Sequence, residues 1–95
     1  MDFSQGQLVR SLAGRDQGKH YLVIGFAGER ALVADGQQRT VHNPKKKNTR
    51  HLQGYKRVSS RVINKLEQGR LTDTDLRQEL QGLLAREGAR GKEVC

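Results

Sequence analysis

GQLVRSLAGRDQGKHYLVIGF, residues 6–26, contains two runs of β-compatible residues that are separated by a short turn flanked by glycines. The first run, QLVRSLA, has a polar residue at every second or third position, and the second, HYLVIGF, is the most apolar run of the chain. In the turn between them, Gly18 can adopt a positive φ without steric cost. This segment therefore predicts a strand, a turn and a central strand.

Short β-compatible runs separated by turn residues continue up to about residue 55. We expect further strands at RALVA (30–34), QQRTVH (37–42) and TRHLQGY (49–55), with Asp35-Gly36 forming a tight type I′ hairpin. Pro44 should end the ladder because it has no N–H to donate. These are about five strands with no crossover long enough for a parallel unit, so the pattern predicts a mainly-β, antiparallel barrel or sandwich.

Helical periodicity replaces this pattern after Lys56. Ser59 or Ser60 is a candidate N-cap for a first helix that Gly69 ends. Thr72 and Asp75 have the spacing of a capping box for a second helix. The expected apolar faces consist of Val62, Ile63 and Leu66 on the first helix, and Leu76, Leu80, Leu83 and Leu84 on the second.

These patterns divide the chain into three parts. Residues 5–57 should form the barrel, residues 58–87 a helical appendage of two short helices, and residues 88–95 a frayed, disordered tail. The leucine stripe should cover the first helix or the barrel, although it could also serve as a docking helix for a partner protein.

The charge of the chain is strongly positive and unevenly distributed. The net charge is +8, of which residues 1–57 hold +7 (11 Lys/Arg against 4 Asp/Glu). Such a balance favours a polyanionic partner, either nucleic acid or an anionic membrane surface. Aromatic residues make up only 4% of the chain, which argues against a single-strand binder that stacks every base on its own ring.

Other sequence features exclude several classes of protein. The single cysteine, Cys95, cannot form a disulfide within the chain, and no Cys or His cluster has zinc spacing. The first ten residues lack the pattern of a signal peptide, and the longest apolar run, YLVIGFA, is too short to cross a bilayer. No nucleophile motif or Walker loop is present. We expect a cytoplasmic protein that has no cofactor and no metal and is not an enzyme.

Residues 6–26, with their strand, glycine turn and second strand, resemble the KOW motif of ribosomal proteins and transcription elongation factors. The continuation ALVADGQQRTVHNPKKKNTRHL is similar to bacterial members of the eukaryotic-type large-subunit ribosomal protein group (the L14e/L6e/L27e-like proteins). The resemblance covers about residues 5–55. It implies an SH3-like barrel that binds structured RNA, in particular ribosomal RNA, and it implies no catalytic activity.

The candidate RNA-binding residues are cations of the expected loops and last strand. In the stretch 42–57, which contains no acidic residue, Pro44, Leu52 and Tyr55 suit a packed segment better than a free arm. We expect a barrel to gather the following residues on one side: Arg15, Lys19, Arg39, Lys45, Lys46, Lys47, Arg50, His51, Lys56 and Arg57.

Each of these candidates also has a plainer interpretation. The lysine triplet 45–47 could be a phosphate-binding loop or a solvated loop that keeps the protein soluble. Asp16 could pair locally with Arg15 or Lys19 in an ordinary hairpin turn. His42 and His51 indicate little by themselves.

The remaining expectations concern where the aromatic side chains lie and which kind of partner the protein binds. Tyr21, Phe26 and Tyr55 are expected in the core, and Tyr55 is the best of them for stacking on a base. The main hypothesis is an RNA-binding protein of the ribosome, and the alternative is a protein-interaction module of the transcription or translation machinery. Binding to anionic lipid is disfavoured because no amphipathic helix with bulky aromatics adjoins the basic stretch.

Overall fold

The computed structural model describes the backbone of residues 3–94 and the side chains of residues 3–87. Five strands come first: β1 (Gln7–Ser11), β2 (His20–Ala27), β3 (Arg30–Ala34), β4 (Lys45–Asn48) and β5 (Leu52–Val58). The 3-10 turn η1 (Thr49–His51) connects β4 to β5, and two helices follow, α1 (Ser60–Gln68) and α2 (Asp73–Val94). The backbone of α2 is helical as far as Val94, beyond residue 87, where the second helix was expected to end. The side chains of residues 88–95 lie outside the described part, and the expected disorder of the tail stays a prediction.

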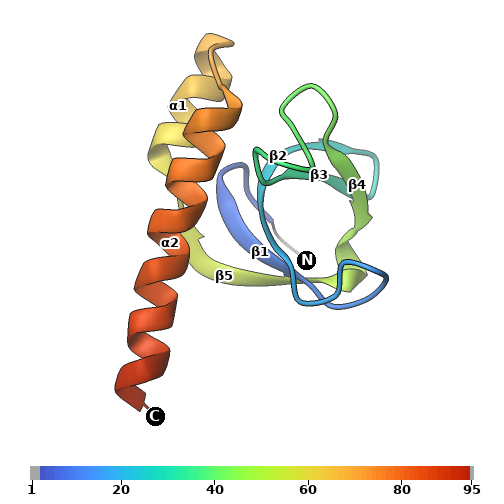
Figure 1. The fold of residues 1–95 in the computed structure, drawn as a ribbon. Coiled ribbons are helices and arrows are strands. Elements are labelled where there is room, and N and C mark those ends of the chain that lie inside the picture. The colour runs from blue at the N-terminus through green and yellow to red at the C-terminus, as the bar shows by residue number, and fades with distance from the viewer. Residues whose placement is uncertain (1–2, 95) are drawn as a thin grey trace.

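The strands form one antiparallel sheet in the order β4-β3-β2-β1-β5. The sheet curls into a barrel-like shape, with both helices along one side and β4 on the side away from them (Figure 1). Register shifts between Gln7 and Val9 in β1 and between Val23 and Gly25 in β2 mark irregularities of the bulge type. Such bulges bend and twist a strand, which helps a small sheet to curl. The predicted mainly-β antiparallel fold with two following helices is confirmed.

Strand alternation gives the sheet two apolar faces. The inner face holds a core of Val9, Tyr21, Val23, Ala31, Val33 and Leu52. The outer face packs against the helices through Leu8, Leu22, Ile24, Ala34, Val62, Leu71, Leu76, Leu80 and Leu83. Burying one such side chain contributes roughly 1.5–3 kcal/mol, so the two faces together account for the compactness of a small chain. The leucine stripe therefore covers the barrel and the first helix, with Leu84 partly buried beside it.

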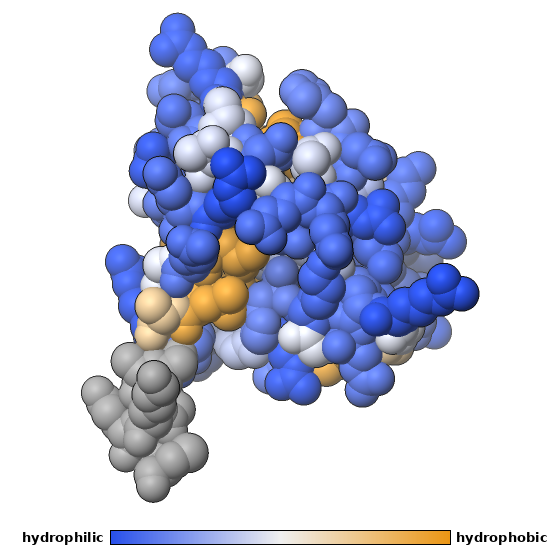
Figure 2. Space-filling view, viewed as in Figure 1, coloured by the Kyte–Doolittle hydropathy of each residue, from blue (hydrophilic) through white to orange (hydrophobic). Residues whose placement is uncertain are grey.

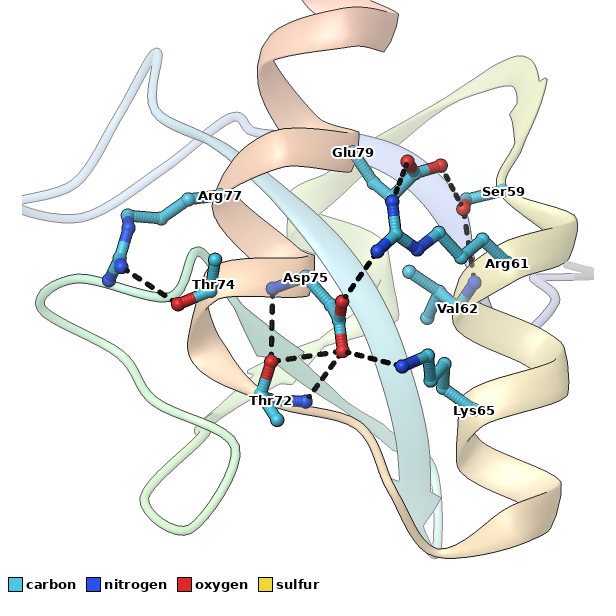
Figure 3. A network of polar contacts seen from close by, with 9 residues as sticks. All are labelled: Ser59, Arg61, Val62, Lys65, Thr72, Thr74, Asp75, Arg77 and Glu79. Carbon is cyan, nitrogen blue, oxygen red and sulfur yellow. Dashed lines mark hydrogen bonds and ion pairs between the residues drawn. The ribbon is translucent and has the colours of Figure 1, made fainter.

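A polar network fixes α2 against α1 (Figure 3). Thr72 Oγ1 accepts a hydrogen bond from Asp75 N at 3.2 Å, and a carboxylate oxygen of Asp75 accepts one from Thr72 N at 3.1 Å, which confirms the capping box. The same carboxylate pairs with Arg61 at 3.1 Å and Lys65 at 3.6 Å. The hydrogen bond from the Thr72 hydroxyl, the largest cause, lowers the pKa of Asp75 although burial opposes it.

Ser59 begins α1 as its N-cap, and Gly69 ends the helix in the left-handed conformation, both as expected. The Ser59 hydroxyl accepts from Val62 N at 3.1 Å and donates to Glu79 of α2 at 2.7 Å. The backbone N–H of Ser59 donates to the carbonyl of Gly6 at 2.8 Å, so the start of α1 is tied to the start of β1. The described residues form no helix that has both the length and the apolar character needed to cross a bilayer.

The fourth strand is not where the sequence predicted it. Residues 37–42 form a loop with one isolated bridge between Thr40 and Asn43, and the fourth strand is the lysine run itself. The Asp35 carboxylate accepts hydrogen bonds from Gln37 N at 2.9 Å and Arg39 N at 3.0 Å, which curls the chain directly after β3. The expected two-residue hairpin at Asp35-Gly36 is therefore wrong.

Two other expectations about the strands need correction. The segment expected as a strand at 49–55 begins with η1, and the strand itself starts at Leu52. Phe26, expected in the core, is 46% exposed. The bulge in β2 precedes it and brings it opposite Ala31 at the open end of the barrel, where little protein covers the ring.

Candidate nucleic-acid interface

The β1–β2 loop (residues 12–19) is organised around one buried acidic side chain. Asp16 is 8% exposed, and its carboxylate accepts hydrogen bonds from Ser11 Oγ at 2.9 Å and from the Tyr21 hydroxyl at 2.8 Å. Lys47 Nζ donates to the same carboxylate at 2.9 Å, and Lys45 Nζ lies 3.1 Å from it. Asp16 therefore pairs with β4 and not, as the plainer interpretation had it, with Arg15 or Lys19 in its own loop.

These contacts decide the charge state of the cluster. Burial alone would raise the pKa of Asp16, but hydrogen bonds from Lys47, Tyr21, Ser11 and Lys45 outweigh it and hold the pKa far below its usual range. Burial and the hydrogen bond to Asp16 raise the pKa of Tyr21. At neutral pH Asp16 is thus a carboxylate and Tyr21 a neutral phenol.

The three consecutive lysines have different environments. Lys47 is 7% exposed and also donates to the carbonyl of Ala13 at 2.7 Å, so it binds the β1–β2 loop to β4. Lys45 is half-buried and paired with Asp16. Lys46 points to the opposite face of the strand, is exposed and forms no ion pair among the described residues. The triplet is therefore a strand and not a loop, and only Lys46 is free for an external anion.

Three segments meet around the Asp16 cluster. Leu12 N donates to the carbonyl of His51 at 2.8 Å, which places the β1–β2 loop beside η1. Lys19 lies 3.6 Å from the Asp35 carboxylate and also donates to Gln38, which places the same loop beside the β3–β4 loop (residues 35–44). The β1–β2 loop thus adjoins the β3–β4 loop, β4 and η1.

Most of the predicted cations lie on these four adjoining segments. We call the following five residues the basic rim: Arg15, Lys19, Arg39, Lys46 and Arg50. Arg15, Lys46 and Arg50 are exposed, and none of the three forms an ion pair with a described residue. His51 is exposed beside Arg50 on η1. Guanidinium groups in this position are suited to bidentate contacts with phosphates.

Lys56 and Arg57 do not join the basic rim. They lie near the end of β5, and Val58 beyond them pairs with Gln7 at the start of β1, whereas the rim adjoins the other end of β1. The guanidinium of Arg57 is also engaged, since its Nε donates to Glu87 of α2 at 2.9 Å. The structure therefore divides the predicted set of residues between two regions.

Two exposed arginines of the sheet are absent from the predicted set. Arg30 pairs with Asn48 across β3 and β4, so it lies on the same outer face as Lys46. Arg10 of β1 pairs with His20 and Gln53. Both lie in segments that the sequence predicted as strands, and alternation against their buried neighbours is the signal that could have identified them as surface cations.

Beside Arg10, His20 and Tyr55 form a pair on the outer face of the sheet. His20 Nε2 lies 3.0 Å from the Tyr55 hydroxyl, and the ring centroids are 5.7 Å apart. Burial, and then the charge of Arg10, lower the pKa of His20. Tyr55 is half-buried in this pair and packs against the outer core, so its ring is not free to stack on a base in this conformation.

The fold and site define a small mainly-β domain with a basic surface and a helical cover on one side. No protein-family model matches the chain. The chain is similar to "Putative ribosome-binding protein YbzG" of Bacillus subtilis (strain 168), with 54% identity over 43 residues. These residues are 44% of this chain and 58% of the relative, so the chain spans little more than half of the relative's length.

Proposed function

We propose that this chain is a cytoplasmic RNA-binding protein that associates with the ribosome through the basic rim, and that it has no catalytic activity. The observation that carries the proposal is the exposure of Arg15, Lys46 and Arg50, none of which forms an ion pair among the described residues, on three adjoining segments: the β1–β2 loop, β4 and η1. The similarity to a protein named as ribosome-binding supports the choice of the ribosome as partner.

The mechanism is electrostatic attachment to a folded RNA. Cations of the basic rim neutralise backbone phosphates and release counterions. The Asp16 cluster holds the β1–β2 loop against β4, so these cations are presented on a rigid surface and lose little entropy on binding. Shape and backbone contacts select the site, because the deep groove of A-form RNA hides its base edges from side chains.

We further propose that the domain is a KOW-type, SH3-like barrel, of the kind that the L14e/L6e/L27e-like proteins carry. The antiparallel order β4-β3-β2-β1-β5 and the 3-10 turn between β4 and β5 support this class. Gly14 and Gly18, which flank the motif's turn, have φ values of 89° and 91°, a conformation that favours glycine.

A protein partner is the second candidate function. Figure 2 shows apolar surface between α2 and the barrel. A shallow cavity of about 110 Å³ opens there, lined by His20, Asp35, Arg77, Leu80 and Leu84 among others. A protein side chain could enter it, and such binding would not require RNA.

Sedimentation of the tagged protein through a sucrose gradient, with and without RNase, tests the proposal. We expect migration with the large ribosomal subunit or its precursors, and loss of this migration after RNase treatment. Migration that survives RNase would favour the protein partner, and recovery only at the top of the gradient would contradict ribosome association.

A matched pair of variants sharpens this experiment. The rim variant changes Arg15, Lys46 and Arg50 to Gln and should return to the top of the gradient. The control variant changes Lys56, Arg70 and Arg86 to Gln, which removes the same charge from exposed positions elsewhere, and should still migrate with the subunit. Equal behaviour of the two variants would show that net charge, not the basic rim, attaches the protein.

A further inference from the structure

A cavity of about 560 Å³ opens beside Arg50 of the basic rim. Four segments meet there: the N-terminal segment with Phe3, the end of β2 with Phe26, the β2–β3 turn with Glu29, and the junction of β4 and η1 with Asn48 and Arg50. The cavity therefore combines two aromatic rings with an amide, a carboxylate and a guanidinium.

Phe26 forms the apolar wall of this cavity, and the sheet keeps its ring exposed to solvent. The register shift between Val23 and Gly25 places Phe26 opposite Ala31, whose side chain belongs to the inner core. Directly opposed residues of an antiparallel pair point to the same face, so the ring lies over the mouth of the barrel. It remains 46% exposed, and Phe3 packs against the inner core from the same mouth.

Backbone hydrogen bonds hold the polar side chains of the cavity in place. Several of their donors and acceptors are not engaged by described residues and can bind a ligand. Asn48 Oδ1 accepts a hydrogen bond from Arg50 N at 2.9 Å, which orients the amide and leaves its N–H groups free to donate. Thr49 Oγ1 donates to the carbonyl of Glu29 over 3.5 Å and joins η1 to the β2–β3 turn. Among the described residues, neither Arg50 nor Glu29 forms an ion pair.

We propose that this cavity receives one unpaired nucleotide of the bound RNA, with its base on Phe26 and its phosphate on Arg50. An aromatic face attracts any base by stacking, the Asn48 amide and the Glu29 carboxylate offer a donor and an acceptor to a base edge, and the guanidinium matches a phosphate. The inference rests on the proposed function and adds to it a preference for RNA that has an unpaired base. The low aromatic content limits the site to one base and not a run of bases.

The nucleotide comes from an RNA strand and not from a free mononucleotide, because Arg50 belongs both to the cavity and to the basic rim. A strand that places one base in the cavity carries its neighbouring phosphates toward the other cations of the rim. A mononucleotide lacks those phosphates, so adenosine monophosphate should bind far more weakly than a short oligoadenylate. Equal affinity for the two would overturn the assignment to RNA.

The test compares the full chain with its Phe26→Ala variant on two probes of equal length, a single-stranded oligoadenylate and a fully paired RNA duplex. Loss of one stacked base should weaken binding of the oligoadenylate by about 5- to 150-fold, whereas duplex binding should be unchanged. Phe26→Tyr, which keeps an aromatic face, should restore binding. Val58→Ala is the control, because Val58 is equally exposed at 46% and does not line the cavity.

The outcomes separate this inference from the proposed function. If Phe26→Ala binds both probes like the native chain, or loses affinity for both equally, the nucleotide site is overturned while RNA binding by the rim stands. If the native chain binds neither probe, the proposed function fails and the nucleotide site fails with it. Because Phe26 is half-exposed, the variant should retain the native melting temperature within a few degrees, which circular dichroism can verify.

Discussion

Lys45, Lys46 and Lys47 are consecutive in the chain, but strand alternation directs Lys46 to one face of β4 and its two neighbours to the other. On the inner side the neighbours meet Asp16, a carboxylate brought in from the β1–β2 loop. A buried charge without its partner is far less stable than the pair, so Lys47 and Asp16 depend on each other. Lys46 has no such dependence.

Lys47→Ala should therefore mainly reduce stability, and Lys46→Ala should mainly reduce RNA binding. Lys47→Ala should lower the free energy of unfolding by about 2–4 kcal/mol, because it removes a buried charge partner of Asp16. Lys46→Ala should change it by no more than about 0.5 kcal/mol but should weaken RNA binding. Urea denaturation and RNA titration of both variants provide the measurement. Equal destabilisation by the two substitutions would contradict the assignment of their roles.

Asp16 should also make the domain sensitive to acid. Its folded-state pKa lies below the ordinary value of 3.8, so as the pH falls the unfolded chain takes up this proton first. The stability that Asp16 contributes is complete above the ordinary value and is lost as the pH falls below it. Asp16→Asn should be less stable at neutral pH and should show a smaller further loss between pH 4 and pH 2, as measured by chemical denaturation.

His20 should add a second pH dependence at a higher range. Burial and the charge of Arg10 lower its folded-state pKa below the ordinary value of 6.5, so the unfolded chain binds this proton first as the pH falls. Stability should decline below about that value, and His20→Gln should remove this part of the decline. An unchanged pH profile in the variant would show that His20 remains solvated and titrates normally.

At the scale of elements, the two helices are attached by polar contacts as well as by leucines. Asp75 caps α2 and pairs with Arg61 and Lys65 of α1, so one carboxylate connects both helices (Figure 3). Glu79 adds the hydrogen bond from Ser59 at the start of α1. These contacts fix the pair of helices as one layer over the outer face of the sheet.

Asp75→Ala should lower the free energy of unfolding by about 2–3 kcal/mol, because it removes the cap, leaves Lys65 without its partner and leaves Arg61 with Glu79 alone. Thr72→Ala should cost about 1 kcal/mol, the usual effect of a lost cap. Glu67→Ala is the control, since Glu67 is an exposed acid on α1. Thermal denaturation of the three variants gives the ranking, and a loss no greater for Asp75→Ala than for Glu67→Ala would contradict it.

The elements also show which features a sequence can reveal. Caps are local, so Ser59, Gly69 and the Thr72–Asp75 box could be predicted from residue type and spacing. The position of β4 could not, because QQRTVH has better strand residues than the lysine run. The Asp35 side chain curls the first segment, and Asp16, distant in the chain, compensates the charge of the second.

The candidate site could be predicted only in part for the same reason. Composition identified the basic residues, but the bulge in β2 decides that Phe26 is exposed, and Gly25 inside the apolar run is the residue type that could have signalled it. The contribution of Phe3 depends on where the N-terminal segment returns to the barrel mouth. The sequence therefore indicated the chemistry of the surface but not which cations were already engaged within the fold.

At the scale of the whole molecule, the net charge of +8 exceeds what the rim displays. Some cations, among them Lys47, Arg57 and Arg61, form ion pairs inside the protein and release no counterions on binding. The number of phosphates neutralised should therefore be well below the number of Lys and Arg residues. The salt dependence of binding measures this number directly.

With about 4–6 phosphates neutralised on duplex-like RNA, the logarithm of the affinity should fall with the logarithm of salt at a slope of roughly −3 to −5. The variant that changes Arg15, Lys46 and Arg50 to Gln should flatten this slope by about 2–3, one phosphate for each cation. The control variant at Lys56, Arg70 and Arg86 should keep the native slope. Fluorescence anisotropy at several salt concentrations gives both values, and equal slopes in the two variants would contradict localised binding.

The order of the sheet places the lysine run on an edge strand, which matters even without a ligand. Within the described residues β4 pairs with β3 alone, so its other backbone edge offers unpaired amide and carbonyl groups to solvent. Such an edge is a template on which a second copy could add a strand and begin aggregation. The exposed charge of Lys46 repels an identical edge and acts as a gatekeeper against it. A variant that lacks this charge should aggregate at a lower protein concentration, even where it still folds.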